Sequence, residues 1–395
     1  MPIFRVCTFA IASLLLLPQV GFAQEGGQPF LVAQANDKAK RTGRITPSSA
    51  ATGETDTVSR VNNWTVGLAG GLLEGTFIRF AAELAKVLDD GENLRVLPVV
   101  TYGAAENVND LLYLKGIDVS ITHADVFDEF RRTGKAATVD RRVNYISQMY
   151  IGELHVYARP EIKKLQDLDG KKVGFHTKGA GPTITGPILF ERLGIKVEPV
   201  FVNNAIALEQ MKTGEIAAIL HTVGKPNDLF SKLKREPGFH FLQVDYTDKF
   251  ADYYVPSTLG HDDYPNLFSP GEKVETLGVP VVLAVYNWPR DNDRFRRVER
   301  FIQHYFDRFE RLKKPPFHAK WKEINLAAKV PGWNRYWVAE ELLARTASST
   351  TATAASTVDE SFARAQAAQA APGNKEEQER LFQRFMEWSK RQKKQ

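Results

Sequence analysis

A glycine-rich turn between Trp64 and Leu88 is the first place where this sequence could bind a charged group. The stretch WTVGLAGGLLEGTFIRFAAELAKVL begins as a short apolar strand, breaks into glycines and continues with apolar residues at helical spacing. Gly70 and Gly75 have the separation found in a phosphate-binding P-loop, but Thr76 follows where that motif has a lysine. The turn therefore predicts no nucleotide site. It predicts a helix N-terminus, whose free amides and positive dipole favour an anion.

Two further strand-to-helix turns repeat this arrangement. The stretch VTYGAAENVNDLL places Gly103 after a strand and starts a helix near Ala105. The stretch GFHTKGAGPTITGPILF places Gly181 before Pro182, a residue suited to the first helical position. In open α/β sheets, ligands bind outside the carboxyl ends of the strands, where such turns lie. We expect the three turns to converge on one anion-binding cleft; the alternative is that their glycines only permit close packing.

Polar residues end two more of the expected strands. The stretch ITHADVF carries Thr122, His123 and Asp125, and ILHTVGKPND carries His221 and Thr222. None of the eight histidines has the H-x-H or H-x-x-x-H spacing of a metal site, so we expect no metal. Asp125 is interpreted as a helix N-cap or as a hydrogen-bond acceptor for a ligand. Without a nucleophile elbow or a Ser-His-Asp grouping, the pattern predicts a binding protein with no catalytic residue and no cofactor.

The elements that position these turns alternate between strands and helices. Apolar runs typical of strands lie at 64–69, 94–100, 118–122, 145–150, 154–159, 171–175, 197–202, 217–222, 240–244 and 279–286. Helix-like stretches lie at 76–88, 106–115, 184–194 and 206–214, followed by 291–312, 320–328 and 335–344. This alternation predicts an α/β fold with mostly parallel sheets.

The first residues predict export. Residues 1–23 contain one arginine, an apolar run and small residues before the expected cut, which is the pattern of a cleavable signal peptide; a membrane anchor is the alternative. The only cysteine, Cys7, lies in this segment, so we expect a mature chain without disulfides. These features indicate a periplasmic protein. The net charge of +5 is spread along the chain and gives no indication of nucleic-acid binding.

Three flanking segments differ in composition from the core. We expect residues 24–62 to form a disordered leader and residues 346–375 to form a low-complexity linker, because both are polar and lack periodicity. Residues 376–395 predict an amphipathic basic helix with Leu381 and Phe385 on its apolar side. Two interpretations of this helix remain open: packing on the core, or docking to a partner protein or an anionic surface.

Taken in order, these stretches resemble the solute-binding proteins of TRAP transporters, in particular those of the TAXI family. The resemblance covers about residues 64–343. It rests on six stretches in the same order, GLAGGLLEGTFIRFAAELAKVL, GAAENVNDLLYLKGIDVSITHADVF, LHVYARPEIKKLQDLDGKKVGF, KGAGPTITGPILFERLGI, TVGKPND and YYVPSTLGHDDYP.

The resemblance implies a two-lobed periplasmic-binding-protein fold of the second type. One lobe would comprise residues 63–154 and 279–345, and the other residues 155–278. A small organic acid, such as glutamate or a dicarboxylate, or an amino acid would bind between the lobes. The receptor, expected to be a monomer, would then close by a hinge motion and deliver the ligand to a TRAP-type permease driven by an ion gradient.

Carried over position by position, the resemblance implies a set of ligand contacts. These are Gly75, Thr76, Gly103, Ala104, Asn107, Thr122, Asp125, Gly181, Thr183, Thr185, Thr222 and Tyr254. Where the family commonly reads Gly-Ser-Gly-Thr, this chain has Gly-Ala-Gly-Pro-Thr. Ala180 removes a hydroxyl and Pro182 removes a backbone donor, so the ligand preference could differ from that of other members.

Two other functions remain open at this point. The same fold could present a ligand to a signalling partner, with the terminal helix as the docking device. It could also carry an enzyme acting on small acids, for which Asp125 or His123 would be the acid or base.

Overall fold

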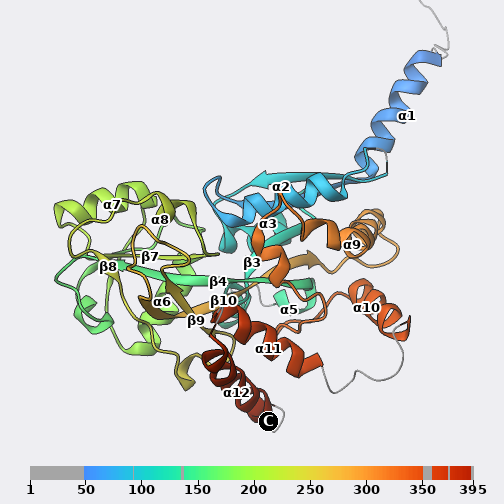
Figure 1. The fold of residues 1–395 in the computed structure, drawn as a ribbon. Coiled ribbons are helices and arrows are strands. Elements are labelled where there is room, and N and C mark those ends of the chain that lie inside the picture. Colours follow the sequence, from blue (N-terminus) through green and yellow to red (C-terminus); the bar gives the residue numbers. More distant parts are fainter. Residues whose placement is uncertain (1–48, 92, 135–137, 350–357, 372–373, 393–395) are drawn as a thin grey trace, which may run out of the picture. The chain divides into compact units, whose positions relative to one another are not determined.

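A mixed ten-stranded sheet forms the centre of the chain (Figure 1). The computed structural model describes residues 49–91, 93–134, 138–349, 358–371 and 374–392. The expected signal peptide and most of the expected leader lie outside these residues. None of the described helices is long and apolar enough to cross a membrane.

The strands run in the order β2-β1-β3-β10-β4-β7-β5-β6, with β8 paired to β4 and β9 paired to β10. Their bounds are β1 (Thr65–Gly71), β2 (Arg95–Val100), β3 (Val119–His123), β4 (Val143–Ala158), β5 (Lys172–Gly174), β6 (Glu198–Val200), β7 (Ala218–Val223), β8 (His240–Phe241), β9 (Val255–Gly260) and β10 (Lys273–Tyr286).

Parallel pairing occurs in two separate groups of strands. We call β2, β1 and β3 the first strand group and β7, β5 and β6 the second strand group. The antiparallel strands β4 and β10 lie between the groups, and we call them the crossing strands. Near Glu153, β4 ends its pairing with β10 and begins its pairing with β7. The α/β fold class expected from the sequence is confirmed, and this topology agrees with the expected two-lobed architecture.

The helices cover the sheet and fill the connections between strands (Figure 1). Their bounds are α1 (Ser49–Asn63), α2 (Thr76–Leu88), α3 (Ala104–Tyr113), α4 (Ala124–Arg132), α5 (Val139–Arg142), α6 (Pro182–Leu193), α7 (Asn204–Thr213), α8 (Asp228–Lys232), α9 (Asp293–Leu312), α10 (Trp337–Ser349), α11 (Val358–Ala370) and α12 (Lys375–Gln392). Short 3₁₀ turns are η1 (Leu165–Leu168), η2 (Asp248–Phe250) and η3 (Ala319–Glu323).

Hydrophobic periodicity explains why the long helices form and which face they bury. In α9, buried apolar residues recur every three or four positions, beginning at Phe295 and ending at Leu312. The side chain of Asn292 caps this helix by accepting a hydrogen bond from the amide of Arg294. The buried face joins the main hydrophobic core, which also contains the central strands β1, β3, β4 and β10.

Several elements differ from the sequence-based expectations. Two strands expected at 145–150 and 154–159 are one strand, β4, because all 16 of its residues are buried and its pairing passes from one strand group to the other. The helix expected at 320–328 is reduced to the 3₁₀ turn η3. Strand β9 was not predicted. Helix α4 has His123 at its N-cap, so Asp125 lies in its first turn and the N-cap interpretation of Asp125 is wrong.

The two segments expected to lack structure both contain helices. Helix α1 lies in the expected leader and shows mainly exposed polar side chains, two of which hydrogen bond back to carbonyls one turn earlier. Helix α11 lies in the expected linker, where Ala363, Ala367 and Ala371 pack against Leu381 and Phe382 of α12. Alanine is the strongest helix former, and its spacing here creates an apolar stripe that α12 covers.

Candidate functional site

The turns β1–α2, β2–α3 and β5–α6 surround one cavity at the carboxyl ends of their strands. Its volume is about 50 Å³, by a measure in which one water needs roughly 10–15 Å³. Both strand groups contribute to its wall. The lining residues are Gly71, Leu72, Gly75, Thr76, Phe77, Tyr102, Gly103, Ala104, His123, Tyr150, His176, Ala180, Gly181, Pro182, His221, Thr222 and Val223.

Six of the twelve expected ligand contacts line this cavity. They are Gly75, Thr76, Gly103, Ala104, Gly181 and Thr222. The other six, Asn107, Thr122, Asp125, Thr183, Thr185 and Tyr254, are absent from the lining.

Three of those six expected contacts hold the turns in shape. The side-chain amide of Asn107 donates to the carbonyl of Ile121 at 2.7 Å, and Thr122 Oγ1 donates to the carbonyl of Ala104 at 2.9 Å. Thr183 Oγ1 donates to the carbonyl of Ala180 at 2.6 Å. Through these bonds, the three side chains stabilise the turns beside the cavity.

Asp125 joins the last two of the expected contacts in a buried cluster. Thr185 Oγ1 donates to Asp125 Oδ2 at 2.6 Å, and the hydroxyl of Tyr254 donates to the same oxygen at 3.1 Å. Burial raises the pKa of Asp125 to about 6. Because Asp125 lies on α4 and Thr185 on α6, the cluster connects helices that follow strands of different groups.

The free amides at the cavity are fewer than the sequence suggested. The amides of Ala105 and Glu106 at the start of α3 donate to the carbonyl of Gly179, at 3.0 and 3.2 Å. In α6, the amides of Thr183 and Thr185 bond to carbonyls of the preceding turn, and a proline at N1 has no N–H. Three turns were expected to present free amides to a ligand. In this arrangement, the amides described at the starts of α3 and α6 are bonded to carbonyls instead.

Helix α2 retains the most favourable N-terminus for a ligand. The first amides of an α-helix have no acceptor within the helix, and Thr76 and Phe77 at the start of α2 both line the cavity. The amide of Gly75 is already bonded to the carbonyl of Leu72 at 2.9 Å. An anion here would meet the positive end of the α2 dipole.

The β2–α3 turn and the turn before α6 touch each other directly across the cavity edge. Gly103 has a φ of 123°, and a Cβ atom placed on it would lie 3.1 Å from the Cα atom of Ala180. Only glycine combines this backbone conformation with this close approach. The bonds from Ala105 and Glu106 to Gly179 depend on that approach.

Polar side chains in the cavity wall lack partners among the described residues. These atoms are both ring nitrogens of His123, Nε2 of His176, Nδ1 of His221, Oγ1 of Thr222 and the hydroxyl oxygen of Tyr150. Nε2 of His176 lies 3.8 Å from a carboxylate oxygen of Glu74, beyond hydrogen-bond distance. Buried polar groups are normally hydrogen bonded, so a cluster of unsatisfied ones in a cavity indicates a ligand position.

The histidines in this wall are uncharged at neutral pH. Burial lowers the pKa of His123 to about 3, and burial with the neighbouring histidines lowers that of His221 well below its usual value. A neutral imidazole offers one N–H donor and one nitrogen acceptor. Among the lining residues that the structure describes, none is lysine or arginine, so a bound anion would be held by neutral donors.

Sequence reasoning missed part of this wall. His176 lies two residues after the end of β5, and this placement after a strand was a usable signal. Tyr150 lies in the middle of β4, where its long apolar surroundings gave no indication of a site. His123 and His221 were singled out by position, but without a ligand-binding role.

A larger, more open cavity of about 550 Å³ adjoins the first through His221. Its lining residues include Glu74, Asn204, Asn227, Asp228 and Lys232. Oδ1 of Asn204 is buried and has no partner among the described residues. His221 lines both cavities, the small inner one and the wider outer one.

Comparison with solved structures gives remote similarities. YhfZ from Shigella flexneri is 16% identical with a TM-score of 0.37, over 68% of this chain and 100% of that one. A periplasmic binding protein of Salmonella typhimurium, described for its high arginine specificity, is 16% identical with a TM-score of 0.37, over 66% and 97%. An amino acid ABC transporter substrate-binding protein of Streptococcus pneumoniae, bound to L-arginine, is 12% identical with a TM-score of 0.36, over 63% and 92%.

No curated protein shows significant similarity to the chain. The NMT1-like family, in contrast, matches residues 69–332. This range includes the end of β1, all of β2 to β10, both cavities and every residue of the inner wall. Because the match extends over well more than half of the sequence, the chain belongs to the NMT1-like family.

Proposed function

We propose that this chain is the periplasmic solute-binding receptor of a TRAP transporter of the TAXI type. It binds a small organic acid, such as glutamate or a dicarboxylate, and delivers it to a permease driven by an ion gradient. The observation that carries this proposal is the inner cavity, where unpartnered polar atoms of His123, His176, His221 and Thr222 meet at the ends of strands from both groups.

The inner cavity suits one carboxylate group better than a whole ligand. Its volume of about 50 Å³ would hold only about three to five waters, on the scale of roughly 10–15 Å³ for one water. A carboxylate there would accept hydrogen bonds from the first amides of α2, from imidazole N–H groups and from Thr222 Oγ1. The rest of the ligand would extend past His221 into the outer cavity, where Asn204 offers an unpartnered acceptor.

Closure of the two strand groups on the ligand would use contacts already described. The bonds from Ala105 and Glu106 to Gly179 join the two turns, and Asp125 joins α4 to α6. Opening about the crossing strands would break these bonds and expose the cavity, as in hinge motions of binding proteins. Ligand and interlobe contacts would thus stabilise the same closed arrangement.

Thermal-shift and calorimetric titration of the exported chain, residues 24–395, would test the proposal. The panel consists of L-glutamate, C4 and C5 dicarboxylates, neutral amino acids, sugars and simple cations. We expect one class of acid to stabilise the protein by about 2.7 kcal/mol at a hundredfold excess over its dissociation constant, and to be recovered unchanged.

A pair of matched variants links binding to the cavity. Thr222→Val removes an unpartnered hydroxyl in the inner wall, whereas Thr213→Val removes an exposed one at the end of α7. We expect weaker acid binding only in the first variant. Stabilisation by sugars or cations alone, or chemical conversion of the acid, would contradict the proposal.

A further inference from the structure

Helices α11 and α12 form a helical hairpin that lies outside the family match of residues 69–332. We call residues 358–392 the C-terminal hairpin. Its helices share a small apolar core of their own, which includes Ala363, Ala367, Leu381 and Phe382. The guanidinium of Arg364 lies 3.8 Å from the ring centroid of Phe382 and forms an ion pair with Glu379 at 2.9 Å. The hairpin is therefore a defined element and not a loose tail.

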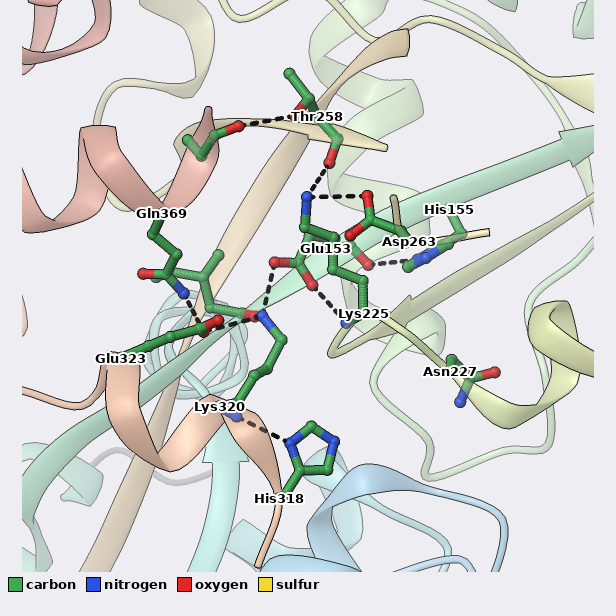
Figure 2. A network of polar contacts seen from close by, with 12 residues as sticks. Glu153, His155, Lys225, Asn227, Thr258, Asp263, His318, Lys320, Glu323 and Gln369 are labelled. Atoms are coloured by element: carbon green, nitrogen blue, oxygen red, sulfur yellow. Dashed lines mark hydrogen bonds and ion pairs between the residues drawn. The ribbon is translucent and has the colours of Figure 1, made fainter. Parts of the chain in front are cut away.

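The C-terminal hairpin is attached to β9, β10 and η3. Figure 1 shows α11 and α12 beside β9 and β10, and Figure 2 shows the contacts that anchor the end of α11. The side-chain amide of Gln369 donates to a carboxylate oxygen of Glu323. Thr258 Oγ1 on β9 donates to the carbonyl of Ala370 at 2.8 Å, and Arg380 forms an ion pair with Glu275 on β10 at 3.4 Å.

Glu323 belongs to a buried ionic network (Figure 2). Nζ of Lys320 lies 2.9 Å from Glu153 Oε1 and 3.2 Å from Glu323 Oε2. Lys320 and Glu153 are each only 2% exposed. Burial acts to lower the pKa of Lys320, but Glu153 and Glu323 raise it above its usual value, so the lysine is charged. Buried charges require well-placed partners, which makes the position of Glu323 important for the whole network.

The same network borders the inner cavity. Oε2 of Glu153 accepts a hydrogen bond from the amide of Lys225 at 2.8 Å, directly after the wall residues of β7. Nζ of Lys320 lies 5.6 Å from the ring centroid of Tyr150, another wall residue. A Cβ atom on Gly224 would lie 2.9 Å from Tyr150 Cε2 and 3.0 Å from Lys320 Cδ, so this packing has no free space.

We propose that the C-terminal hairpin controls the shape of the inner cavity through Glu323 and Lys320, which act as positioning residues. The path runs from Gln369 to Glu323, then to Lys320, and from there to Tyr150 and to Glu153. The hairpin thereby adjusts ligand affinity without contacting the ligand. Only this effect on affinity rests on the proposed function, because the cavity shape can be measured without a ligand.

Variants of Gln369 in the full exported chain test this inference. Gln369→Ala removes the contact with Glu323, and Gln369→Glu replaces it with repulsion between two carboxylates. Gln383→Ala is the matched control, since the side-chain amide of Gln383 donates to Glu379 within α12. Hydrogen exchange is followed by mass spectrometry in peptides covering residues 218–226, and L-glutamate affinity is measured by calorimetry.

We expect both Gln369 variants to exchange faster than wild type in residues 218–226 and to bind L-glutamate about fivefold more weakly, at the lower end of typical coupling between sites. The control should match wild type in both measurements. The double variant Gln369→Glu with Glu323→Gln reverses the donor and acceptor, and it should restore most of the lost affinity and protection.

Unchanged exchange in residues 218–226 of both Gln369 variants would overturn the inference, even if exchange in α11 shows that the hairpin has detached. If the double variant binds L-glutamate as weakly, and exchanges as fast, as the more impaired of the two Gln369 variants, Glu323 is not part of the path. If L-glutamate binds none of the proteins, the proposed ligand fails, while the exchange measurement still decides the inference.

Discussion

Replacing Asp125 with asparagine tests the buried contact that joins α4 to α6. The hydroxyls of Thr185 and Tyr254 both donate to one carboxylate oxygen of Asp125, at 2.6 and 3.1 Å, and an amide oxygen can accept both. Burial raises the pKa of Asp125 from 3.8 to about 6. The folded chain therefore holds this proton more tightly than the unfolded chain, and the carboxyl group reduces stability as the pH rises from about 4 to about 6.

The size of this effect follows from the two pKa values. A difference of about two units corresponds to about 3 kcal/mol of stability, all of it lost once the pH is well above the folded-state value. Asp125→Asn has no proton to lose. We therefore expect its advantage over wild type to grow by about 2 kcal/mol between pH 4.5 and pH 7.5, because about 1 kcal/mol is already lost at pH 4.5, and then to stay constant.

Urea unfolding of both proteins across this pH range measures the difference directly. The buried His123 and His155 act in the opposite sense, because burial lowers the pKa of each to about 3 and their contribution is lost as the pH falls below 6.5. They are present in both proteins and cancel in the comparison. A stability difference that does not change with pH, or that shrinks as the pH rises, would refute the argument.

Four further substitutions, one of them a control, address single features of the structure. Lys320→Met should lower the free energy of unfolding by about 3–5 kcal/mol in urea titrations, because it leaves the buried Glu153 without its cation. Gly103→Ala should cost about 1–3 kcal/mol and weaken acid binding, since it combines backbone strain with a collision against the opposite turn. Gly116→Ala, with a φ of 103° but open space around it, should show the strain alone in the same assays and leave binding intact. Gly75→Leu should abolish acid binding in calorimetry, because the added side chain fills a lining position. It should lower the melting temperature only modestly, since its φ of −87° suits any residue but a Cβ atom would lie 3.1 Å from the carbonyl oxygen of Leu72.

The convergence of the turns could be predicted because it depends on sheet geometry alone. Gly75, Gly103 and Gly181 each follow a strand, and the carboxyl ends of neighbouring parallel strands share one edge of a sheet. Thr222 reaches the same cavity from the end of β7 by the same rule. Local patterns were therefore sufficient to identify half of the expected contacts as wall residues.

The hydrogen bonding of the turns could not be predicted in this way. Whether an amide is free for a ligand depends on which distant carbonyl approaches it, and at α3 that carbonyl belongs to Gly179 in the other strand group. The family resemblance implied that Asn107, Thr122 and Thr183 contact the ligand. Each instead satisfies a carbonyl of a neighbouring segment, a choice that only the packed structure makes visible.

The histidines that line the inner cavity show how burial changes the chemical role of a residue. His123 was a candidate acid or base in the sequence, where its usual pKa near neutrality makes it suitable for proton transfer. In the structure it is almost fully buried, its pKa falls to about 3, and it offers a neutral donor and acceptor. His155 is equally buried, but its two ring nitrogens already have partners in Glu153 and Tyr264. What distinguishes His123, which is available to a ligand, from the structural His155 is whether the ring nitrogens already have hydrogen-bond partners.

The expected linker and the expected terminal helix were interpreted separately in the sequence. In the structure they pack against each other as α11 and α12. The alanine-rich segment appeared to be a linker because alanine carries no strong pattern, and the amphipathic helix after it appeared to need a cover for its apolar side. In the structure, Ala363 and Ala367 supply that cover for Leu381 and Phe382. A partner protein that used the same apolar side would have to displace α11, and with it the contact between Gln369 and Glu323. Under the inference drawn above, such binding would alter the inner cavity, so docking at the C-terminal hairpin and ligand affinity would be linked in both directions.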